Sequence, residues 1–264
     1  MPFSQRIRGA SFREEYDETF FLQNAEVVED LSSATNRSTS SSSFLNRNTH
    51  IIPPKAKHLK HKLTVVLDLD ETIVYARDGP LYVRPHIDEL FRFLAAHCET
   101  IVWTSSIRRY ADAVVSQVDK FAAVKHIVYR HPSWCGNQVK DLKLLGRDLE
   151  STLIIENTPD CMRGYEANGL LVEDYTGGEL EDRTLLSLLN LLQDLVRCRD
   201  VEHLSVPEYL RRTRLAPLCR VVTDKGNYME CHCINSELED TRTYFAEVPA
   251  SSLLQSDFTN AIVC

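Results

Sequence analysis

Two carboxylates stand two residues apart, at Asp68 and Asp70, where the apolar strand pattern of residues 63–67 ends. Polar groups at the carboxyl ends of parallel strands converge on the crevice in which open α/β sheets bind ligands. An acid pair there suggests phosphoryl transfer. One carboxylate attacks phosphorus, its neighbour handles the leaving-group proton, and a magnesium ion screens the charge. The alternative, in which Asp68 ends a strand and Asp70 begins a turn, is common for an isolated acid pair.

Three further polar groups follow in order along the chain. Thr104 comes after a second apolar run, Lys140 lies in a loop, and the pair Glu156-Asn157 follows a third apolar run. A hydroxyl can hold a phosphate oxygen, a lysine can neutralise the phosphoryl charge, and an acid or amide pair can complete a hard-cation site. Singly, these residues also fit a helix cap, a surface charge and a strand-ending turn. Their joint order favours one phosphate-handling site.

The hydrophobic pattern predicts the elements that must position these groups. Residues 63–67 form a nearly continuous apolar run, typical of a parallel strand buried on both faces. Further strands are predicted at 101–103, 127–129 and 153–155, and helices at 87–94, 110–118 and 179–196. This alternation predicts an α/β fold with a Rossmann-like parallel sheet and the polar groups gathered at one edge.

The chain resembles the haloacid-dehalogenase superfamily, and within it the small phosphatases of the RNA polymerase II C-terminal domain and their Dullard-like relatives. The resemblance covers residues 62–206, and its motifs are VLDLDET at 66–72, RPHIDEL at 84–90, WTSS at 103–106, YAD at 110–112, VKDL at 139–142, LGRDL at 145–149 and ENTP at 156–159. It implies a magnesium-dependent phosphatase that hydrolyses phosphoserine or phosphothreonine in proteins through an aspartyl-phosphate. The connections after Thr72 and Trp103 are too short for a large cap domain, which favours a protein substrate over a small metabolite.

The resemblance also implies a role for each matching residue. Asp68 would be the nucleophile, and Asp70 the general acid and base, which also offers its backbone carbonyl to the metal. The implied phosphate-binding residues are Thr104, Ser105, Arg130 and Lys140. The implied magnesium ligands are Asp68, Asp70, Asn157 and Glu156.

Two departures from the family pattern limit what the resemblance implies. Glu156 stands where these phosphatases usually carry aspartate, and magnesium tolerates displaced ligands badly. The connection from Thr72 to Arg84 lacks the insert with which the polymerase-tail phosphatases hold their peptide. A binding module without phosphatase activity, like the presequence receptor of a mitochondrial translocase, is therefore the alternative. Retention of Asp68 and Asp70 favours the enzyme, because a receptor has no chemical need for two repelling carboxylates.

Composition narrows the class of protein. The 264 residues carry a formal charge of -8, which argues against general nucleic-acid binding and favours basic flanking sequences in a phosphoprotein substrate. No run of about 18 apolar residues is present, so no membrane span is expected. Eight scattered cysteines without an apolar leader predict reduced thiols and an intracellular protein, nuclear or cytoplasmic rather than mitochondrial. The oligomeric state is left open.

Three segments are predicted along the chain. Residues 1–60 are expected to be a disordered, Ser-rich and basic tail, because so polar a segment cannot offset its ordering entropy by burial. Residues 61–206 are the predicted catalytic domain. In the extension 207–264, the pattern predicts a β-hairpin over 219–234, which a strand at 243–248 could join. The spacing of Cys219, Cys231 and Cys233 favours half-buried thiols over a zinc site.

Overall fold

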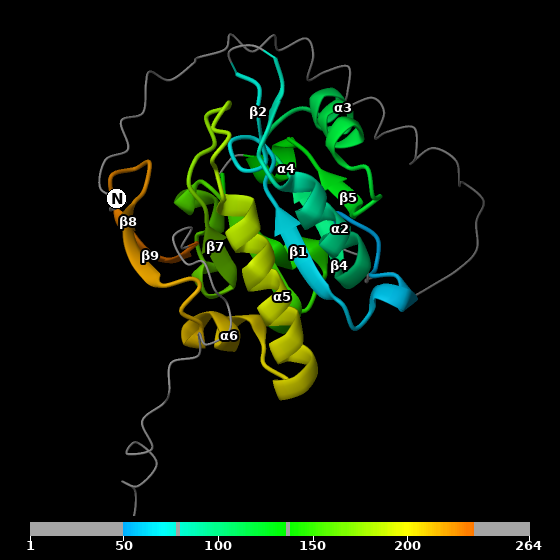
Figure 1. The fold of residues 1–264 in the computed structure, drawn as a ribbon, viewed down its shortest axis with the longest axis vertical. Helices are drawn as coiled ribbons and strands as arrows, with labels where there is room; N and C mark the ends of the chain where they lie inside the picture. The colour runs from blue at the N-terminus through cyan, green and yellow to red at the C-terminus, as the bar shows by residue number, and fades with distance from the viewer. Residues whose placement is uncertain (1–49, 78–79, 136–137, 235–264) are drawn as a thin grey trace, which may run out of the picture. The chain divides into compact units, whose positions relative to one another are not determined.

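The structure is a computed structural model that describes residues 50–77, 80–135 and 138–234. Its centre is a seven-stranded sheet (Figure 1). The strands are β1 (Leu63–Leu67), β4 (Cys98–Trp103), β5 (Val124–Val128), β6 (Thr152–Glu156), β7 (Gly169–Leu171), β8 (Leu218–Val222) and β9 (Tyr228–Cys233). Their order in the sheet is β5-β4-β1-β6-β7-β9-β8, and every neighbouring pair is parallel except β8 with β9. The predicted α/β fold with a parallel sheet is confirmed.

Helices and short 3-10 turns connect the strands. The α-helices are α2 (Ile87–His97), α3 (Arg108–Val118), α4 (Pro132–Cys135), α5 (Thr184–Glu202) and α6 (Val206–Arg212). The 3-10 turns are η1 (Lys57–Leu59), η2 (Leu142–Leu145), η3 (Leu149–Ser151), η4 (Pro159–Met162) and η5 (Glu166–Asn168). A separate antiparallel pair, β2 (Val74–Tyr75) with β3 (Tyr82–Val83), lies in the connection between Thr72 and α2. This pair occupies the place where a large cap domain would have to be inserted.

The sheet separates two hydrophobic cores. Side chains of β1 alternate between them: Val65 and Leu67 pack in the core that also contains residues of α2, α3, α5 and α6, and Val66 packs in the other. In Figure 1, α2 and α5 lie side by side over one face of the sheet, and their contacts agree with this. The second core contains Trp103, Met162 and residues of η2 and the β8–β9 hairpin. Because both faces are covered, β1 consists entirely of buried residues, as its apolar pattern predicted.

The long leucine-rich helix begins later than the apolar pattern predicted. The pattern indicated a start at residue 179, whereas α5 begins at Thr184 and continues to Glu202. Asp182 explains the late start, because its carboxylate accepts the Thr184 N–H at 2.9 Å and also pairs with the Arg84 guanidinium. An aspartate used in this way favours a turn before the helix over another helical turn.

The predicted C-terminal hairpin is present and continues the central sheet. β8 pairs with β9, and β9 pairs in parallel with β7. Cys219 is half-buried, as predicted, whereas Cys231 and Cys233 are fully buried, because β9 lies between β7 and β8 and these thiols belong to the second core. Residues 1–49 of the predicted tail and the predicted strand at 243–248 lie outside the described residues.

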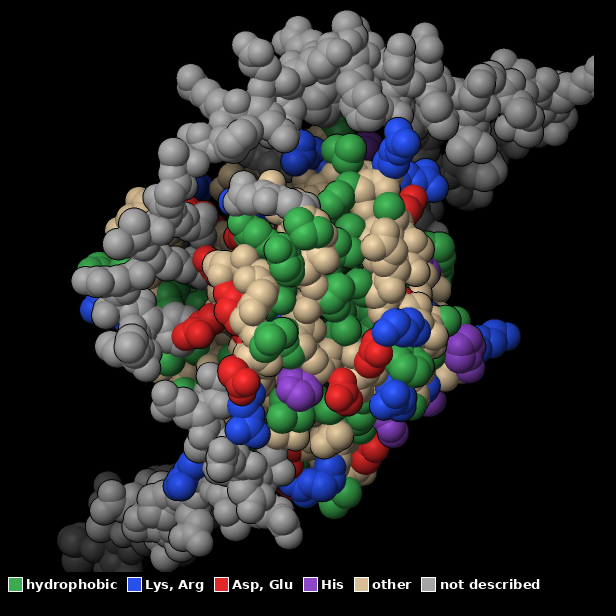
Figure 2. Space-filling view, turned by 45° about the horizontal axis from the view of Figure 1, so that its top comes forward, with side chains coloured by type: hydrophobic (Ala, Val, Ile, Leu, Met, Phe, Trp, Pro, Cys, Tyr) green, Lys and Arg blue, Asp and Glu red, His purple; other side chains and the backbone are tan. Residues whose placement is uncertain are grey.

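Figure 2 shows hydrophobic and charged side chains interspersed on one face, with acidic side chains gathered along one side.

None of the helices in the described ranges has the length and apolar character needed to cross a bilayer.

Candidate active site

Three adjacent parallel strands deliver the candidate residues to one edge of the sheet. Asp68 follows β1 and continues its pairing, because the Asp68 N–H donates to the Ile155 carbonyl of β6 at 3.0 Å. Thr104 follows β4, and Glu156 is the last residue of β6. Since β4, β1 and β6 are neighbours that run in the same direction, their ends place these side chains together.

Lys140 lies between two buried carboxylates. Its Nζ is 2.6 Å from Asp68 Oδ1 and 2.5 Å from Glu156 Oε2, and all three side chains are at least nine-tenths buried. The second oxygen of Glu156 accepts the Thr158 N–H at 3.2 Å. Both carboxylate oxygens of Glu156 therefore have partners within the protein, and its longer side chain reaches Lys140.

The electrostatics of this group are unbalanced, since two carboxylates share one ammonium. Burial raises the pKa of Asp68 above its ordinary value, although Lys140 opposes the shift. Burial and the neighbouring Asp68 carboxylate raise the pKa of Glu156 to about 7. Burial alone would lower the pKa of Lys140, but the two carboxylates outweigh it and raise the pKa. The lysine therefore stays charged, and the two carboxylates together carry more negative charge than the lysine neutralises.

Asp70 is held by three hydroxyl groups. Its Oδ2 accepts from Thr104 Oγ1 at 3.1 Å and from Ser106 Oγ at 2.7 Å. Its Oδ1 accepts from the Tyr110 hydroxyl of α3 at 2.6 Å. The motif pattern included Ser106 and Tyr110, but only the structure shows that they orient Asp70.

Thr72 connects the nucleophile candidate to Asn157, a link that the sequence analysis missed. Its buried Oγ1 lies 3.0 Å from Asp68 Oδ2 and 3.4 Å from Asn157 Oδ1. The Asn157 amide group donates to Asp174 Oδ1 at 3.0 Å, which turns its oxygen towards Thr72. The VLDLDET motif contained Thr72, but nothing in its spacing indicated contact with a residue 85 positions away.

Arg84 supports the loop that carries this threonine. Its buried guanidinium donates to the Thr72 carbonyl at 2.9 Å and to the Glu173 carbonyl at 3.0 Å, and it pairs with Asp182. Within the same loop, Glu71 has a left-handed φ of 62°, a conformation that costs free energy for a residue with a Cβ. Arg84 thus joins the loop after β1 to the segment before α5.

The two weaker phosphate-binding candidates lie on the neighbouring loop. Ser105 is exposed, and its carbonyl accepts from Arg130 Nε at 2.6 Å. The Arg130 N–H donates to the Ser106 carbonyl at 2.9 Å, so the loop after β4 and the loop after β5 are joined. Arg130 therefore lies beside the Thr104-to-Ser106 loop.

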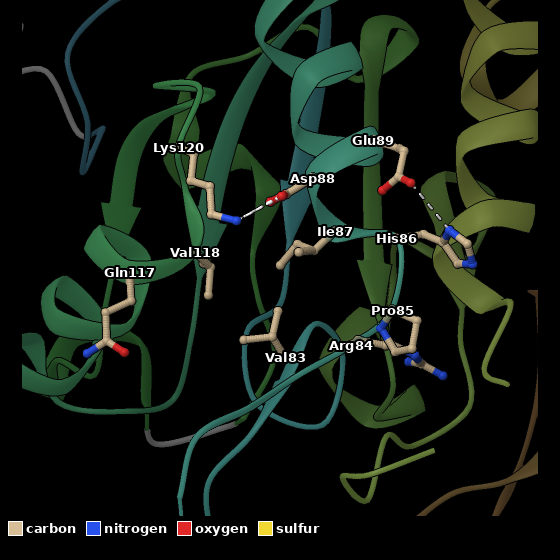
Figure 3. Close-up of a pocket in the computed structure, with 10 residues that line it drawn as sticks. All are labelled: Val83, Arg84, Pro85, His86, Ile87, Asp88, Glu89, Gln117, Val118 and Lys120. Atoms are coloured by element: carbon tan, nitrogen blue, oxygen red, sulfur yellow. Dashed lines mark hydrogen bonds and ion pairs between the residues drawn. The ribbon is translucent and has the colours of Figure 1, made fainter. Parts of the chain in front are cut away.

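A separate pocket of about 310 Å³ lies between β3, the start of α2 and the end of α3. Figure 3 shows its lining residues, among which the Lys120 ammonium reaches Asp88. His86 lies 3.7 Å from Glu89 on another side of the pocket. Asp68, Lys140 and Glu156 do not line it, so the pocket is distinct from the acid cluster.

The sequence model of the NLI interacting factor-like phosphatases matches residues 63–202, which contain every candidate residue described above. The chain belongs to this family. The resemblance drawn from the motifs is confirmed.

Curated relatives of this chain carry names from the same family. A Dictyostelium discoideum protein named "Probable C-terminal domain small phosphatase" is 34% identical over 173 residues, which cover 57% of this chain and 56% of that protein. The human "Carboxy-terminal domain RNA polymerase II polypeptide A small phosphatase 1" is 31% identical over 174 residues, covering 58% of this chain and 66% of the relative. This chain therefore spans between half and two thirds of their length.

Among solved structures, the fission yeast RNA polymerase II CTD phosphatase Fcp1-R271A bound to beryllium fluoride matches with a TM-score of 0.39. It is 14% identical, and the match covers 54% of this chain and 52% of that one.

The oxygen donors around Asp68 are of the kind that a magnesium ion takes as ligands. The Asp68 carboxylate and the Asn157 amide oxygen are both within hydrogen-bond reach of one hydroxyl, that of Thr72. Hard cations of this size take such oxygen ligands together with main-chain carbonyls and water. In the described residues, no group of three His, Cys, Asp or Glu side chains is placed to hold a metal. A metal here would therefore need amide and main-chain oxygens as well.

Proposed function

We propose that this protein is a magnesium-dependent phosphatase that hydrolyses phosphoserine or phosphothreonine in proteins through an aspartyl-phosphate on Asp68. The observation that carries the proposal is the buried group of Asp68, Lys140 and Glu156, with Asp70 held beside it by hydroxyl donors. Two carboxylates sharing one lysine leave an excess of negative charge that a divalent cation can neutralise, and the cation and Lys140 together supply the positive charge that a phosphoryl transition state requires.

The proposed reaction has two steps, formation of the aspartyl-phosphate and its hydrolysis. An Asp68 oxygen attacks phosphorus, the bond from phosphorus to the serine or threonine oxygen breaks, and Asp70 gives its proton to the departing oxygen. Asp70 then takes a proton from a water molecule, which attacks phosphorus and releases inorganic phosphate from Asp68. Lys140 keeps the nucleophile oriented and neutralises charge in both steps, and the three hydroxyls hold Asp70 in one rotamer.

Asp68, Asn157 and the Asp70 carbonyl would hold the magnesium ion. Glu156, which the resemblance also implies as a ligand, has both carboxylate oxygens hydrogen-bonded within the protein, so it would instead keep Lys140 in place. When bound, the ion supplies electrostatic stabilisation of the negative charge on the phosphoryl oxygens. Thr104, Ser105 and Arg130 would complete the phosphate site, since they lie on the two joined loops beside Asp70.

A phosphoprotein fits the site better than a small metabolite. Among the described residues of the connection from Thr72 to Arg84, the short β2–β3 pair is the only regular structure, and four residues separate β4 from α3. The loop that supplies Asp174 to the site also carries exposed Glu173, Glu179 and Glu181, which favour basic residues beside the phosphorylated one. The human relative is named for the RNA polymerase II carboxy-terminal domain. For this chain, phosphoproteins as a class are proposed.

The test is hydrolysis of an aryl phosphate in magnesium by the Asp68→Asn variant. The amide has nearly the same volume and lacks the anionic nucleophile, so turnover should fall by at least about 10³-fold. Asp112→Asn is the matched control, because Asp112 is an exposed carboxylate paired with Arg108 on α3 and should leave turnover unchanged. Wild-type turnover in Asp68→Asn would refute the mechanism.

A second experiment separates the enzyme from a binding module of the same fold. Beryllofluoride mimics phospho-aspartate, so with magnesium it should raise the melting temperature of the parent protein and leave that of Asp68→Asn unchanged. A parent protein without any response would favour the binding module.

A further inference from the structure

The β8–β9 hairpin lies outside the segment that matches the family, yet its turn contacts the active-site region. The Asp224 N–H in the turn donates to Asp160 Oδ2 at 3.0 Å. Asp160 belongs to η4, three residues after the metal-ligand candidate Asn157. A segment at the far end of the described chain is therefore hydrogen-bonded to the loop that leaves β6.

Asp160 is a buried carboxylate with defined partners. It is 3% exposed, its Oδ1 pairs with Arg163, and its Oδ2 receives the Asp224 N–H. Such a group stabilises a loop only while its partners remain, because a buried carboxylate without hydrogen bonds is costly. The hairpin supplies one of these partners from its backbone.

The same 3-10 turn holds the catalytic lysine by its backbone. The Lys140 N–H donates to the Cys161 carbonyl at 2.8 Å. Met162, the next residue, packs in the second core with Val221 of β8 and Met229 of β9. The hairpin thus donates a hydrogen bond to η4 at Asp160, and Met162 of η4 belongs to the same hydrophobic core as side chains of both hairpin strands.

We propose that the β8–β9 hairpin is part of the catalytic unit and that Asp160 is the positioning residue through which its turn orients Lys140 and Asn157. The inference rests on the proposed function for its effect on catalysis. Its structural part, the fixing of η4 by the Asp224 N–H, can be measured without activity.

A proline in the hairpin turn can remove the hydrogen bond from the Asp224 N–H to Asp160. The Gly226 N–H donates to the Thr223 carbonyl at 2.9 Å, which makes Asp224 the second residue of a four-residue turn. Asp224 and Lys225 both have negative φ and Gly226 has a φ of 76°, so proline fits at position 224 as it does in type I turns. Asp224→Pro removes the N–H that Asp160 accepts. Asp224→Ala, the matched control, removes the side chain and keeps the N–H.

The first measurement is hydrogen exchange in the metal-free, full-length protein. In Asp224→Pro, the Lys140 amide and the amides of η4 should exchange about fivefold faster than in Asp224→Ala and the parent, as expected when one hydrogen bond of about 1 kcal/mol is lost. Equal exchange in all three proteins would overturn the proposal.

The second measurement is turnover of an aryl phosphate as a function of magnesium concentration. Asp224→Pro should need about tenfold more magnesium for half-maximal activity and have a lower kcat, while Asp224→Ala matches the parent. A parent protein without turnover refutes the proposed function and leaves the exchange result to decide the inference. An unchanged magnesium requirement in an active Asp224→Pro overturns the inference alone.

A second pair of variants covers the case in which Asp224→Pro does not fold. Asp160→Asn keeps an oxygen that accepts the Asp224 N–H, and Asp160→Ala removes it. The asparagine variant should recover most of the Lys140 amide protection and of the magnesium response that the alanine variant loses. Equal values for the two variants would contradict a positioning role.

Discussion

Two buried ion clusters lie at opposite ends of the central strands, and they are balanced differently. Glu99, the second residue of β4, lies near the start of the strands, and Asp68 and Glu156 lie at their ends. Both Glu99 oxygens are 2.8 Å from Arg147 nitrogens, and Lys55 lies 3.7 Å away. One carboxylate there has two cationic partners, whereas at the other end two carboxylates share one lysine.

The pKa shifts have opposite directions at the two ends. Burial works against the charged form of Glu99, but Arg147 and Lys55 outweigh it and lower the pKa of Glu99. Burial raises the pKa values of Asp68 and Glu156 despite Lys140. The Glu99 cluster is complete and supports the fold. The Asp68 cluster is short of positive charge, a condition that a bound divalent cation would relieve.

Among the tests of this comparison, the largest expected effect comes from Lys140→Met, which removes the cation between Asp68 and Glu156. Turnover should fall by at least about 10²-fold, because the nucleophile and the phosphoryl group both lose their counter-charge. Stability should fall as well, since two buried carboxylates then face each other. Urea unfolding and aryl phosphate turnover measure the two effects.

Glu156→Gln in the Lys140→Met background is the control for that variant. The double variant should regain part of the lost unfolding free energy and none of the turnover. A double variant less stable than Lys140→Met would show that repulsion between the carboxylates is not the cause.

Arg147→Met should affect stability alone. Arg147 is buried and is the main partner of Glu99, so its loss should lower the free energy of unfolding by about 3–5 kcal/mol. The folded fraction should keep its kcat within about twofold, because the cluster lies at the other end of the strands. A large fall in kcat at a temperature where the variant remains folded would contradict the separation of the two clusters.

Thr72→Val tests the link between Asp68 and Asn157 at nearly constant volume. The half-saturating magnesium concentration should rise by about tenfold, because the hydroxyl orients two ligand candidates. Thr100→Val is the matched control, since within the described residues the buried Thr100 hydroxyl has no hydrogen-bond partner. That variant should be at least as stable as the parent and need no extra magnesium.

The smallest effect concerns pH and stability. Because the pKa of Glu99 is lowered in the folded state, its contribution is fully present above the ordinary value of 4.5 and is lost as the pH falls from that value through the lowered folded-state pKa. Urea unfolding from about pH 5 to about pH 3 should therefore show a steeper loss of stability in the parent than in Glu99→Gln. Identical slopes would show that Glu99 is not paired in the folded state.

Much of the fold followed from local pattern. The apolar run before Asp68 was predicted as a strand over residues 63–67, and β1 has those bounds, because a strand buried on both faces leaves a continuous apolar signal. The predicted start of α5 was wrong, because the ion pair between Asp182 and the distant Arg84 leaves no signal in the local sequence. β7 and α6 were not predicted, since three and seven residues give too little periodicity.

Part of the candidate site could also be predicted from the sequence, and part could not. Asp68, Thr104 and Glu156 could be grouped from the sequence, because parallel strands bring their carboxyl ends to one edge. The hydrogen-bond partners of these residues could not be predicted from the sequence. The hydroxyls around Asp70, the Thr72 bridge to Asn157 and the hairpin contact at Asp160 join residues up to 85 positions apart.

The sequence by itself determined which chemical groups are present and at which end of the sheet they lie, since strand period and motif order are properties of short segments. The tertiary structure alone decided how those groups are paired and charged. Hydrogen bonds and ion pairs depend on distances between loops that no local pattern encodes. Glu156 shows this clearly: its substitution for aspartate was visible in the sequence, but its contact with Lys140 became visible only when β6 and the Lys140 loop were placed together.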